Sequence, residues 1–240
     1  MSITPYKNLT TTKKQQVEAM FDNIAPNYDL LNHVLSCGID ILWRRKVIGL
    51  LKKYDPKYIL DVATGTGDFA VEAIKLNPTK VYGVDISEEM LAVGKEKVQK
   101  KGLTEIIELQ KGDAENLPFE DNKFDAITVG FGVRNFENLE KGLSDMYRVL
   151  KTDGVIAILE FSKPKMFLFK QVYEFYFLKI LPLIGKLISK DSTAYTYLPE
   201  SVIAFPDADD FLKILKDIGY KETKCIPLTF GISSIYIARK

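Results

Sequence analysis

Three aspartates stand close to a glycine-containing stretch in the first half of the chain. Asp61 opens the stretch Asp-Val-Ala-Thr-Gly-Thr-Gly-Asp, which ends at Asp68, and Asp85 follows about 20 residues after the first glycine, at the end of an expected strand. Glycines let the backbone approach a ligand closely at the start of a helix. A carboxylate at a strand end can bind both hydroxyls of a ribose. The pattern therefore predicts a site for a ligand that contains a ribose.

The acids beside this stretch distinguish two such ligands. The motif Gly65-x-Gly67-x-x-Ala70 fits the fingerprint of dinucleotide-binding loops, in which a helix start holds a pyrophosphate. Asp61 and Asp68 would repel a pyrophosphate, which favours a ligand with an ammonium and a sulfonium, S-adenosylmethionine. An NAD-dependent oxidoreductase is the alternative enzyme, and a strand–helix turn that binds no ligand is the structural alternative.

Two further segments follow expected strands. Gly112-Asp113-Ala114 places an acid where the edge of an adenine would lie, and Gly130-Phe-Gly-Val-Arg134-Asn135 comes after the next strand. The carboxyl ends of parallel strands meet at one edge of an open α/β sheet, where such sheets bind ligands. We therefore expect both segments to share one site with Asp85.

Composition excludes other classes of function. Lys and Arg number 33 against 32 Asp and Glu, so the net charge of +1 provides no basic field for nucleic acid. One histidine, His33, and two distant cysteines, Cys37 and Cys225, form no metal or disulfide pattern. The first residues, MSITPYKNLTTTKKQQ, contain no apolar region of a signal peptide. The sequence predicts a cytoplasmic protein without a metal site.

The elements that position these residues alternate along the chain. Short apolar runs predict buried strands, and periodic segments with capping residues predict helices between them. The expected strands are 58–62, 80–84, 106–110, 124–130 and 155–161, and the expected helices are 68–76, a segment that begins at Ser87, and 139–150. This alternation predicts an α/β fold with a mostly parallel Rossmann-like sheet that is covered on both faces.

The two ends of the chain differ from this core. Helices are expected before the first strand, one capped by Thr11 or Thr12 and another by Asp40. A later helix, capped by Asp207, precedes two β-like runs at 221–230 and 232–238, which predict an antiparallel hairpin at the sheet edge. We expect one domain, 1–240, with a helical cap at 1–55, a ligand-binding core at 56–162, a helical insertion at 163–205, and a C-terminal helix and hairpin at 206–240.

Several motifs together resemble a known family. The loop at 61–68, Asp85 and the Gly-Asp-Ala segment are similar to class I methyltransferases. Longer segments resemble the menaquinone/ubiquinone-biosynthesis C-methyltransferases, and they are Tyr28-Asp29-Leu30-Leu31-Asn32-x-x-Leu35-Ser36, Gly130-Phe131-Gly132-Val133-Arg134-Asn135, Leu159-Glu160-Phe161-Ser162-Lys163-Pro164 and Tyr195-x-Tyr197-Leu198-x-Glu200-Ser201. The resemblance covers nearly the whole chain. Asp40 stands where the family usually has His, and Thr152-Asp153 replaces Pro-Gly, both at expected caps or turns.

The resemblance implies a methyltransferase that moves a methyl group from S-adenosylmethionine to a ring carbon of a demethylated prenyl quinol. Demethylmenaquinol is the first choice and the benzoquinol of ubiquinone biosynthesis the second, because Gly130 stands where some members, notably ubiquinone-type ones, carry Ser, which mildly favours the menaquinone side. A nucleotide-binding regulatory module is the alternative that is not an enzyme. The expected cofactor-binding residues are Asp61, Gly65, Thr66, Gly67, Asp85, Asp113, Ala114 and Gly130.

Arg134 is the predicted catalytic residue. Attack by a ring carbon requires an electron-rich quinol, and loss of the neighbouring hydroxyl proton leaves a phenolate to be stabilised. Arginine stays protonated, so it can hold this oxyanion or orient the water that takes the proton. The candidate substrate residues are Tyr28, Asp29, Asn32, Asn135 and Tyr195.

The segment from Met166 to Gly185 is rich in aromatic and aliphatic residues. Lys170, Glu174 and Lys179 interrupt it too often for a membrane span. A buried cap helix is one interpretation. The other is an apolar face that admits a prenyl tail or makes a peripheral contact with the inner face of the membrane.

Overall fold

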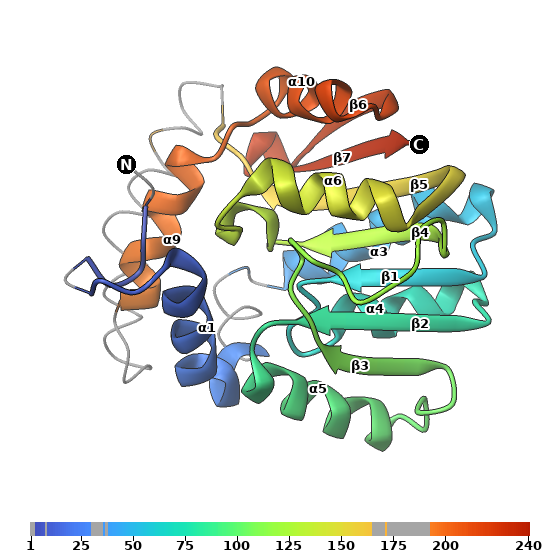
Figure 1. Cartoon of the computed structure of the whole chain (residues 1–240), viewed down its shortest axis with the longest axis horizontal. Helices are drawn as coiled ribbons and strands as arrows, with labels where there is room; N and C mark the ends of the chain where they lie inside the picture. The colour runs from blue at the N-terminus through green and yellow to red at the C-terminus, as the bar shows by residue number, and fades with distance from the viewer. Residues whose placement is uncertain (1–2, 8, 30–35, 37, 165–170, 172–192) are drawn as a thin grey trace.

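The structure, a computed structural model, describes residues 3–7, 9–29, 36, 38–164, 171 and 193–240. In this part of the chain one sheet has the strand order β3-β2-β1-β4-β5-β7-β6. The strands are β1 (Tyr58–Val62), β2 (Lys80–Asp85), β3 (Ile107–Lys111), β4 (Phe124–Gly130), β5 (Leu150–Phe161), β6 (Lys221–Leu228) and β7 (Ser233–Arg239). The first five run parallel, and β7 pairs antiparallel with both β5 and β6 (Figure 1). The predicted fold class is confirmed.

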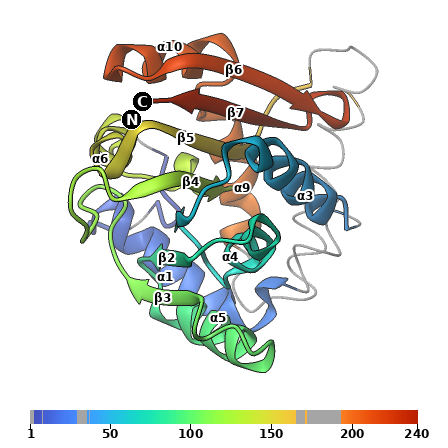
Figure 2. The same ribbon diagram turned by 90° about the vertical axis from the view of Figure 1, so that its right-hand side faces the viewer.

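Helices cover both faces of this sheet (Figure 2). One layer contains α3 (Ile39–Leu51), α4 (Asp68–Ala73) and α5 (Glu88–Lys100), and the other contains α6 (Leu139–Val149) and α10 (Asp209–Ile218). Successive strand side chains point to opposite faces, so Ile59 packs in the first layer and its neighbour Leu60 in the second. This alternation explains why the central strands carry apolar residues on both faces.

Two helices lie beyond the carboxyl ends of the central strands (Figure 1). They are α1 (Lys13–Ile24) and α9 (Thr193–Ala204). Val17, Met20 and Ile24 of α1 pack with Met90 of α5 and Tyr197 of α9 in a third apolar cluster. The short helices are η1 (Ala25–Asn27), η2 (Lys52–Tyr54), η3 (Ile74–Leu76), η4 (Val133–Asn135) and η6 (Thr229–Gly231).

Helix starts agree only in part with the sequence prediction. Thr12 caps α1 in a capping box with Gln15, as expected. Asp40 was predicted as a cap, which is wrong, because α3 follows Gly38 at φ 74° and Asp40 instead pairs with Arg44 within the helix. The prediction for Asp207 is also wrong, since α10 follows Ala208, whose side chain makes no cap. In both cases a residue with positive φ turns the chain into the helix.

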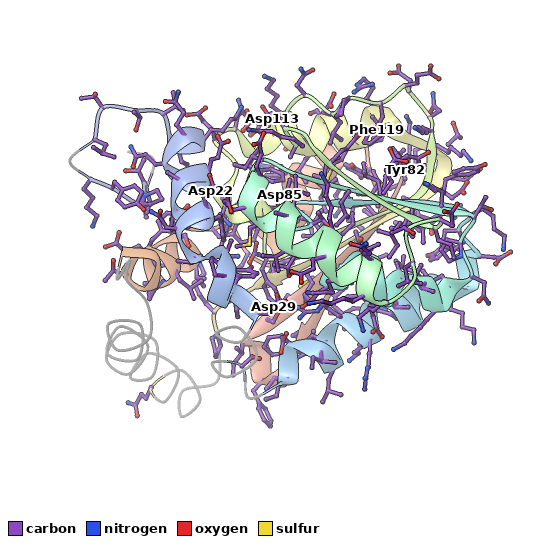
Figure 3. All side chains as sticks on the ribbon, turned by 90° about the horizontal axis from the view of Figure 1, so that it is seen from below. Asp22, Asp29, Tyr82, Asp85, Asp113 and Phe119 are labelled. Carbon is purple, nitrogen blue, oxygen red and sulfur yellow. The ribbon has the colours of Figure 1, made fainter. Side chains whose placement is uncertain are left out.

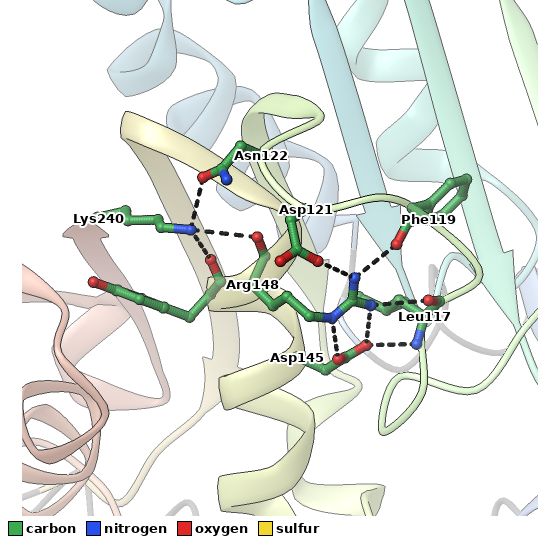
Figure 4. Close-up of polar contacts among 8 residues, drawn as sticks. Leu117, Phe119, Asp121, Asn122, Asp145, Arg148 and Lys240 are labelled. Atoms are coloured by element: carbon green, nitrogen blue, oxygen red, sulfur yellow. Dashed lines mark hydrogen bonds and ion pairs between the residues drawn. The ribbon is translucent and has the colours of Figure 1, made fainter.

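The loop between β3 and β4 is fixed from α6 by Arg148 (Figure 4). Its guanidinium donates to the carbonyls of Leu117 over 3.0 Å and Phe119 over 2.7 Å. It also pairs with Asp121 at 2.8 Å and Asp145 at 2.7 Å. Arg148 therefore fixes the loop that begins at the carboxyl end of β3.

Candidate functional site

A pocket lies at the carboxyl ends of the central strands, beneath α1. It contains about 670 Å³ of space, part of it open to solvent. The loops after β1, β3 and β4, the end of β2 and the inner face of α1 all line it. The structure brings these predicted site residues together at the pocket: Tyr28, Gly65, Asp85, Asp113, Ala114, Gly130 and Asn135.

Asp85 is held at the end of β2 with its carboxylate at this pocket (Figure 3). Oδ2 accepts a hydrogen bond of 2.8 Å from the N–H of Gly65, and Oδ1 accepts one of 3.0 Å from the N–H of Ser87. Burial raises the pKa of Asp85, and these two hydrogen bonds act in the opposite direction. Each oxygen can accept a further hydrogen bond. The geometry therefore fits a ligand with vicinal hydroxyls, such as the ribose of S-adenosylmethionine.

The loop after β1 turns through three residues with positive φ. Ala63, Gly65 and Gly67 have φ of 52°, 55° and 80°. A Cβ on Gly65 would have one neighbour within 4 Å, Cε1 of Tyr28 at 3.9 Å. Glycine is therefore needed at position 65 for the backbone conformation and not for lack of space.

Asp61 lies beneath the loop, outside the set of pocket-lining residues. Its carboxylate accepts hydrogen bonds from the hydroxyls of Thr64 at 2.5 Å and Thr128 at 2.8 Å. Burial raises the pKa of Asp61 to about 7, against the effect of these hydrogen bonds. The structure thus gives Asp61 a role in fixing the loop, and its predicted cofactor contact stays a prediction.

Asp68 lies at the start of α4, close to two cations. Arg44 is 2.9 Å from its Oδ2, and Lys97 is 2.6 Å from its Oδ1. The negative charge of Asp68 is therefore screened at the loop by two cations, and the raised pKa of Asp61 reduces its negative charge near neutral pH. The electrostatic argument against a pyrophosphate is weaker than the sequence indicated, because the cations that pair with Asp68 lie 24 and 29 residues away along the chain.

On the opposite side of the pocket, Lys14 of α1 forms an ion pair with Asp113 of the loop after β3. Asp113 Oδ2 lies 2.6 Å from Lys14 Nζ, and Oδ1 accepts the N–H of Glu115 over 2.9 Å. Figure 3 shows Asp113 and Asp85 near each other beside α1 and α5. Ala114 lines the pocket beside Asp113 with little exposure. These residues form a wall with both hydrogen-bond acceptors and apolar surface.

Gly130 forms a tightly packed part of the pocket wall. A Cβ on this residue would lie 2.8 Å from Cδ2 and 3.1 Å from Cε2 of Phe69. A serine here would therefore require the ring to move. Glycine at position 130 is explained by close packing against α4 and not by its backbone conformation, because its φ is not in the left-handed region.

Arg134 is directed towards a buried acid. Nη1 donates to Oε1 of Glu160 over 2.8 Å and also to the carbonyl of Phe131. The guanidinium carbon lies 5.5 Å from the ring centroid of Phe161, a cation–π arrangement. Arg134 is not among the pocket-lining residues, whereas Asn135 is. A catalytic role for Arg134 stays a prediction.

Three buried polar atoms near η4 have no hydrogen-bond partner within the described residues. They are Nε of Arg134, Oδ1 of Asn135 and the hydroxyl of Tyr197. Burial raises the pKa of Tyr197 to about 12, so the hydroxyl is protonated at neutral pH. Such groups are costly to leave unpaired, and a polar ligand can satisfy them. Sequence reasoning missed Tyr197, whose only signal was its position in the segment that also contains Tyr195.

The remaining predicted residues divide into two groups. Asp29 accepts a hydrogen bond of 2.5 Å from Thr66 Oγ1, and it pairs with Lys97 at 2.7 Å. Outside the described residues lie Asn32, the side chain of Tyr195, His33, and all of 165–192 except residue 171.

Of the helices described, none is long and apolar enough to cross a membrane. The described part of the chain also contains no group of three His, Cys, Asp or Glu side chains that could hold a metal ion.

Comparison with known proteins shows similarity along nearly the whole chain. The model of the ubiE/COQ5 methyltransferase family matches residues 9–240. A demethylmenaquinone methyltransferase of Bacteroides fragilis is 52% identical over 239 residues, which cover 99% of this chain and 97% of that protein. A ubiquinone/menaquinone biosynthesis C-methyltransferase of Geotalea daltonii is 48% identical over 232 residues, with coverage of 96% and 98%.

The fold is also found among solved structures. A SAM-dependent methyltransferase of Thermotoga maritima, described as a possible histamine N-methyltransferase, has a TM-score of 0.66 at 20% identity. The match covers 92% of this chain and 99% of that chain. At this level of identity the likeness concerns the fold alone.

Proposed function

The chain belongs to the ubiE/COQ5 methyltransferase family, and from this premise we propose that it transfers a methyl group from S-adenosylmethionine to a ring carbon of demethylmenaquinol. We infer this substrate from the 52% identity, over 99% of the chain, to a relative named demethylmenaquinone methyltransferase. The benzoquinol of ubiquinone biosynthesis is the second candidate, because the name of a relative with 48% identity includes both quinones. Family membership supersedes the NAD-dependent and non-enzyme alternatives.

We assign the methyl donor to the part of the pocket between the loop after β1 and the loop after β3. Asp85 would bind the ribose hydroxyls, and Asp113 with Ala114 would contact the adenine. The loop residues Gly65, Thr66 and Gly67, supported by Asp61, would lie along the amino-acid part, and Gly130 would face the reacting end. The donor supplies an electrophilic methyl carbon, and these residues would bind the donor and orient that carbon.

We assign the quinol to the side of the pocket near η4. In the transfer, the hydroxyl next to the reacting ring carbon gives its proton to water, that ring carbon forms a bond to the methyl carbon, and the bond from the methyl carbon to sulfur breaks and leaves S-adenosylhomocysteine. The ring carbon then loses its own proton to water and the oxygen regains one, so that one proton is released overall. The negative charge that develops on the neighbouring quinol oxygen needs a donor. The unpartnered Nε of Arg134 and hydroxyl of Tyr197 support their assignment as donors, and Oδ1 of Asn135 supports its assignment as an acceptor.

A prenyl quinol is a lipid-soluble substrate, so we propose a peripheral contact with the inner face of the membrane. In this proposal the insertion 163–205 is the cap that admits the prenyl tail, and 1–55 is the cap over the methyl donor. Within the described part of the insertion, Ile203 of α9 is a large apolar side chain with 61% exposure. A single exposed apolar side chain is common on protein surfaces, so the proposal rests on the lipid solubility of the substrate and on the apolar composition of 166–185.

Quinone profiling tests the proposed substrate. The chain is expressed in a host that makes both quinones and lacks its own quinone C-methyltransferase, and the lipid extract is analysed by mass spectrometry. Conversion of the accumulated demethylmenaquinone to menaquinone supports the proposal. Methylation of the benzoquinone precursor alone would contradict it and favour the second candidate.

A further inference from the structure

We propose that Lys97 is a positioning residue of the methyl-donor site, which acts by holding Tyr28 over the loop after β1. This inference rests on the assignment of that loop to the methyl donor. Lys97 lies in α5 and does not line the pocket. It therefore acts through other residues and makes no contact with the reacting atoms.

Lys97 joins segments that are far apart in the sequence. Its Nζ lies 2.7 Å from Asp29 Oδ2, 2.6 Å from Asp68 Oδ1 and 3.1 Å from the hydroxyl of Thr66. The same hydroxyl donates to Asp29 Oδ1 over 2.5 Å. One ammonium thus connects α5, the loop after β1, the start of α4, and the segment after η1 that contains Asp29, which Figure 3 labels.

The charges explain why this cation matters. Two carboxylates share one ammonium, and without it they would repel each other at short distance. The side chain of Lys97 is 19% exposed, so water screens these pairs less than it screens a pair on the open surface. Asp68 also pairs with Arg44 at 2.9 Å. Within the described part of the chain, Lys97 is the cation that pairs with Asp29. Loss of Lys97 would therefore leave Asp29 without this cation, whereas Asp68 would keep Arg44.

Movement of Asp29 would change the pocket through the preceding residue. Tyr28 lines the pocket, and its Cε1 is 3.9 Å from the position of a Cβ on Gly65. Its ring meets that of Phe21, another lining residue, edge to face at 6.0 Å. Asp29 therefore fixes the backbone that carries one wall of the donor site. Release of this wall would let the bound donor dissociate faster.

The test is the affinity for S-adenosylmethionine, measured by calorimetry together with the dissociation rate. Lys97→Met is expected to weaken binding about tenfold or more, mainly through faster dissociation, on the scale of losing a hydrogen bond to a charged group. Lys97→Arg keeps the charge and is expected to retain most of the affinity. Lys100→Met is the matched control, because Lys100 lies on the same helix but pairs with an exposed Glu96; its affinity should be unchanged.

A double variant separates positioning from general damage. Lys97→Met with Asp29→Asn removes the repulsion and leaves an amide oxygen for the Thr66 hydroxyl, so affinity should recover. Normal affinity in Lys97→Met would overturn the inference, and so would a double variant as weak as the single one at equal melting temperature. If Lys97→Met does not fold, Asp29→Ala carries the test, and unchanged affinity in that variant would overturn the role of the contact. Failure of the unsubstituted protein to bind would instead contradict the donor site itself.

Discussion

Arg134 donates a hydrogen bond from Nη1 to Oε1 of Glu160 over 2.8 Å, and the two side chains are only 9% and 0% exposed. Burial raises the pKa of Glu160, whereas the charge of Arg134 acts in the opposite direction. A buried charge that loses its partner destabilises a fold much more than the intact pair stabilises it. Any test of catalysis at Arg134 must therefore also change Glu160.

Arg134→Met alone is expected to lower the free energy of unfolding by about 3–5 kcal/mol, because Glu160 stays buried without its cation. In Arg134→Met with Glu160→Gln most of this stability should return. The turnover of the double variant should stay about a hundredfold below that of the parent, the scale of losing one donor to a developing oxyanion. Urea denaturation and single-turnover methyl transfer with reduced quinol measure the two effects. Full activity in the double variant would show that Arg134 only supports the fold.

In contrast to Arg134→Met, the substitution Tyr197→Phe is expected to lower activity without lowering stability. The hydroxyl of Tyr197 is buried without a partner in the described structure. Its removal should leave the free energy of unfolding unchanged or raise it by about 1 kcal/mol, while methyl transfer slows because the quinol loses a contact. The matched control is Tyr220→Phe, since the hydroxyl of Tyr220 donates to the carbonyl of Leu143 over 3.1 Å. This control should lose about 1 kcal/mol of stability and keep its activity. Equal activity in the two variants would contradict the role of Tyr197.

Asp85→Ala tests the donor site. Loss of the acceptor for two ribose hydroxyls should weaken binding of S-adenosylmethionine about tenfold to a hundredfold. Asp85→Asn is the companion variant, because one amide oxygen can still accept from the N–H of Gly65 and support the loop. It should recover part of the affinity in calorimetry. Unchanged affinity in a folded Asp85→Ala variant would show that the ribose lies elsewhere.

The raised pKa of Asp61 predicts that the stability of the protein depends on pH. Burial raises its pKa in the folded state to about 7 from a usual value of 3.8. The folded protein therefore binds the proton more tightly than the unfolded chain, and this contribution to stability, full below pH of about 4, is lost as the pH rises through about 7. The amide in Asp61→Asn does not titrate. The stability of the parent relative to this variant, measured by denaturation between about pH 5 and pH 8, should fall as the pH rises. A constant difference would contradict the raised pKa.

Local patterns predicted much of the fold. The strand at Tyr58–Val62, the strand at Phe124–Gly130 and the cap at Thr12 agree with the structure. Each of these depends on residues that are close in sequence, such as an apolar run or a capping box. The start of β5 at Leu150 was missed, since the polar residues Lys151 to Asp153 interrupt the apolar run.

The site was harder to predict because its charges are paired across the fold. No motif or spacing indicated that Asp68 pairs with Arg44, or that Arg134 is directed to Glu160. Such pairs arise from the packing of elements, and no spacing along the chain encodes them. Asp85 was predictable, because a strand end and a following cap fix its position locally.

Methyl transfer in solution tests the central claim most directly. The purified protein is incubated with S-adenosylmethionine labelled in its methyl group and with demethylmenaquinone reduced chemically before addition, and the product is analysed by mass spectrometry. We expect one labelled methyl group on a ring carbon of the reduced naphthoquinol and none when the quinone is left oxidised, because only the quinol ring is electron-rich enough to attack. Absence of labelled product from the reduced naphthoquinol, in a preparation that binds the donor, would contradict the proposed function.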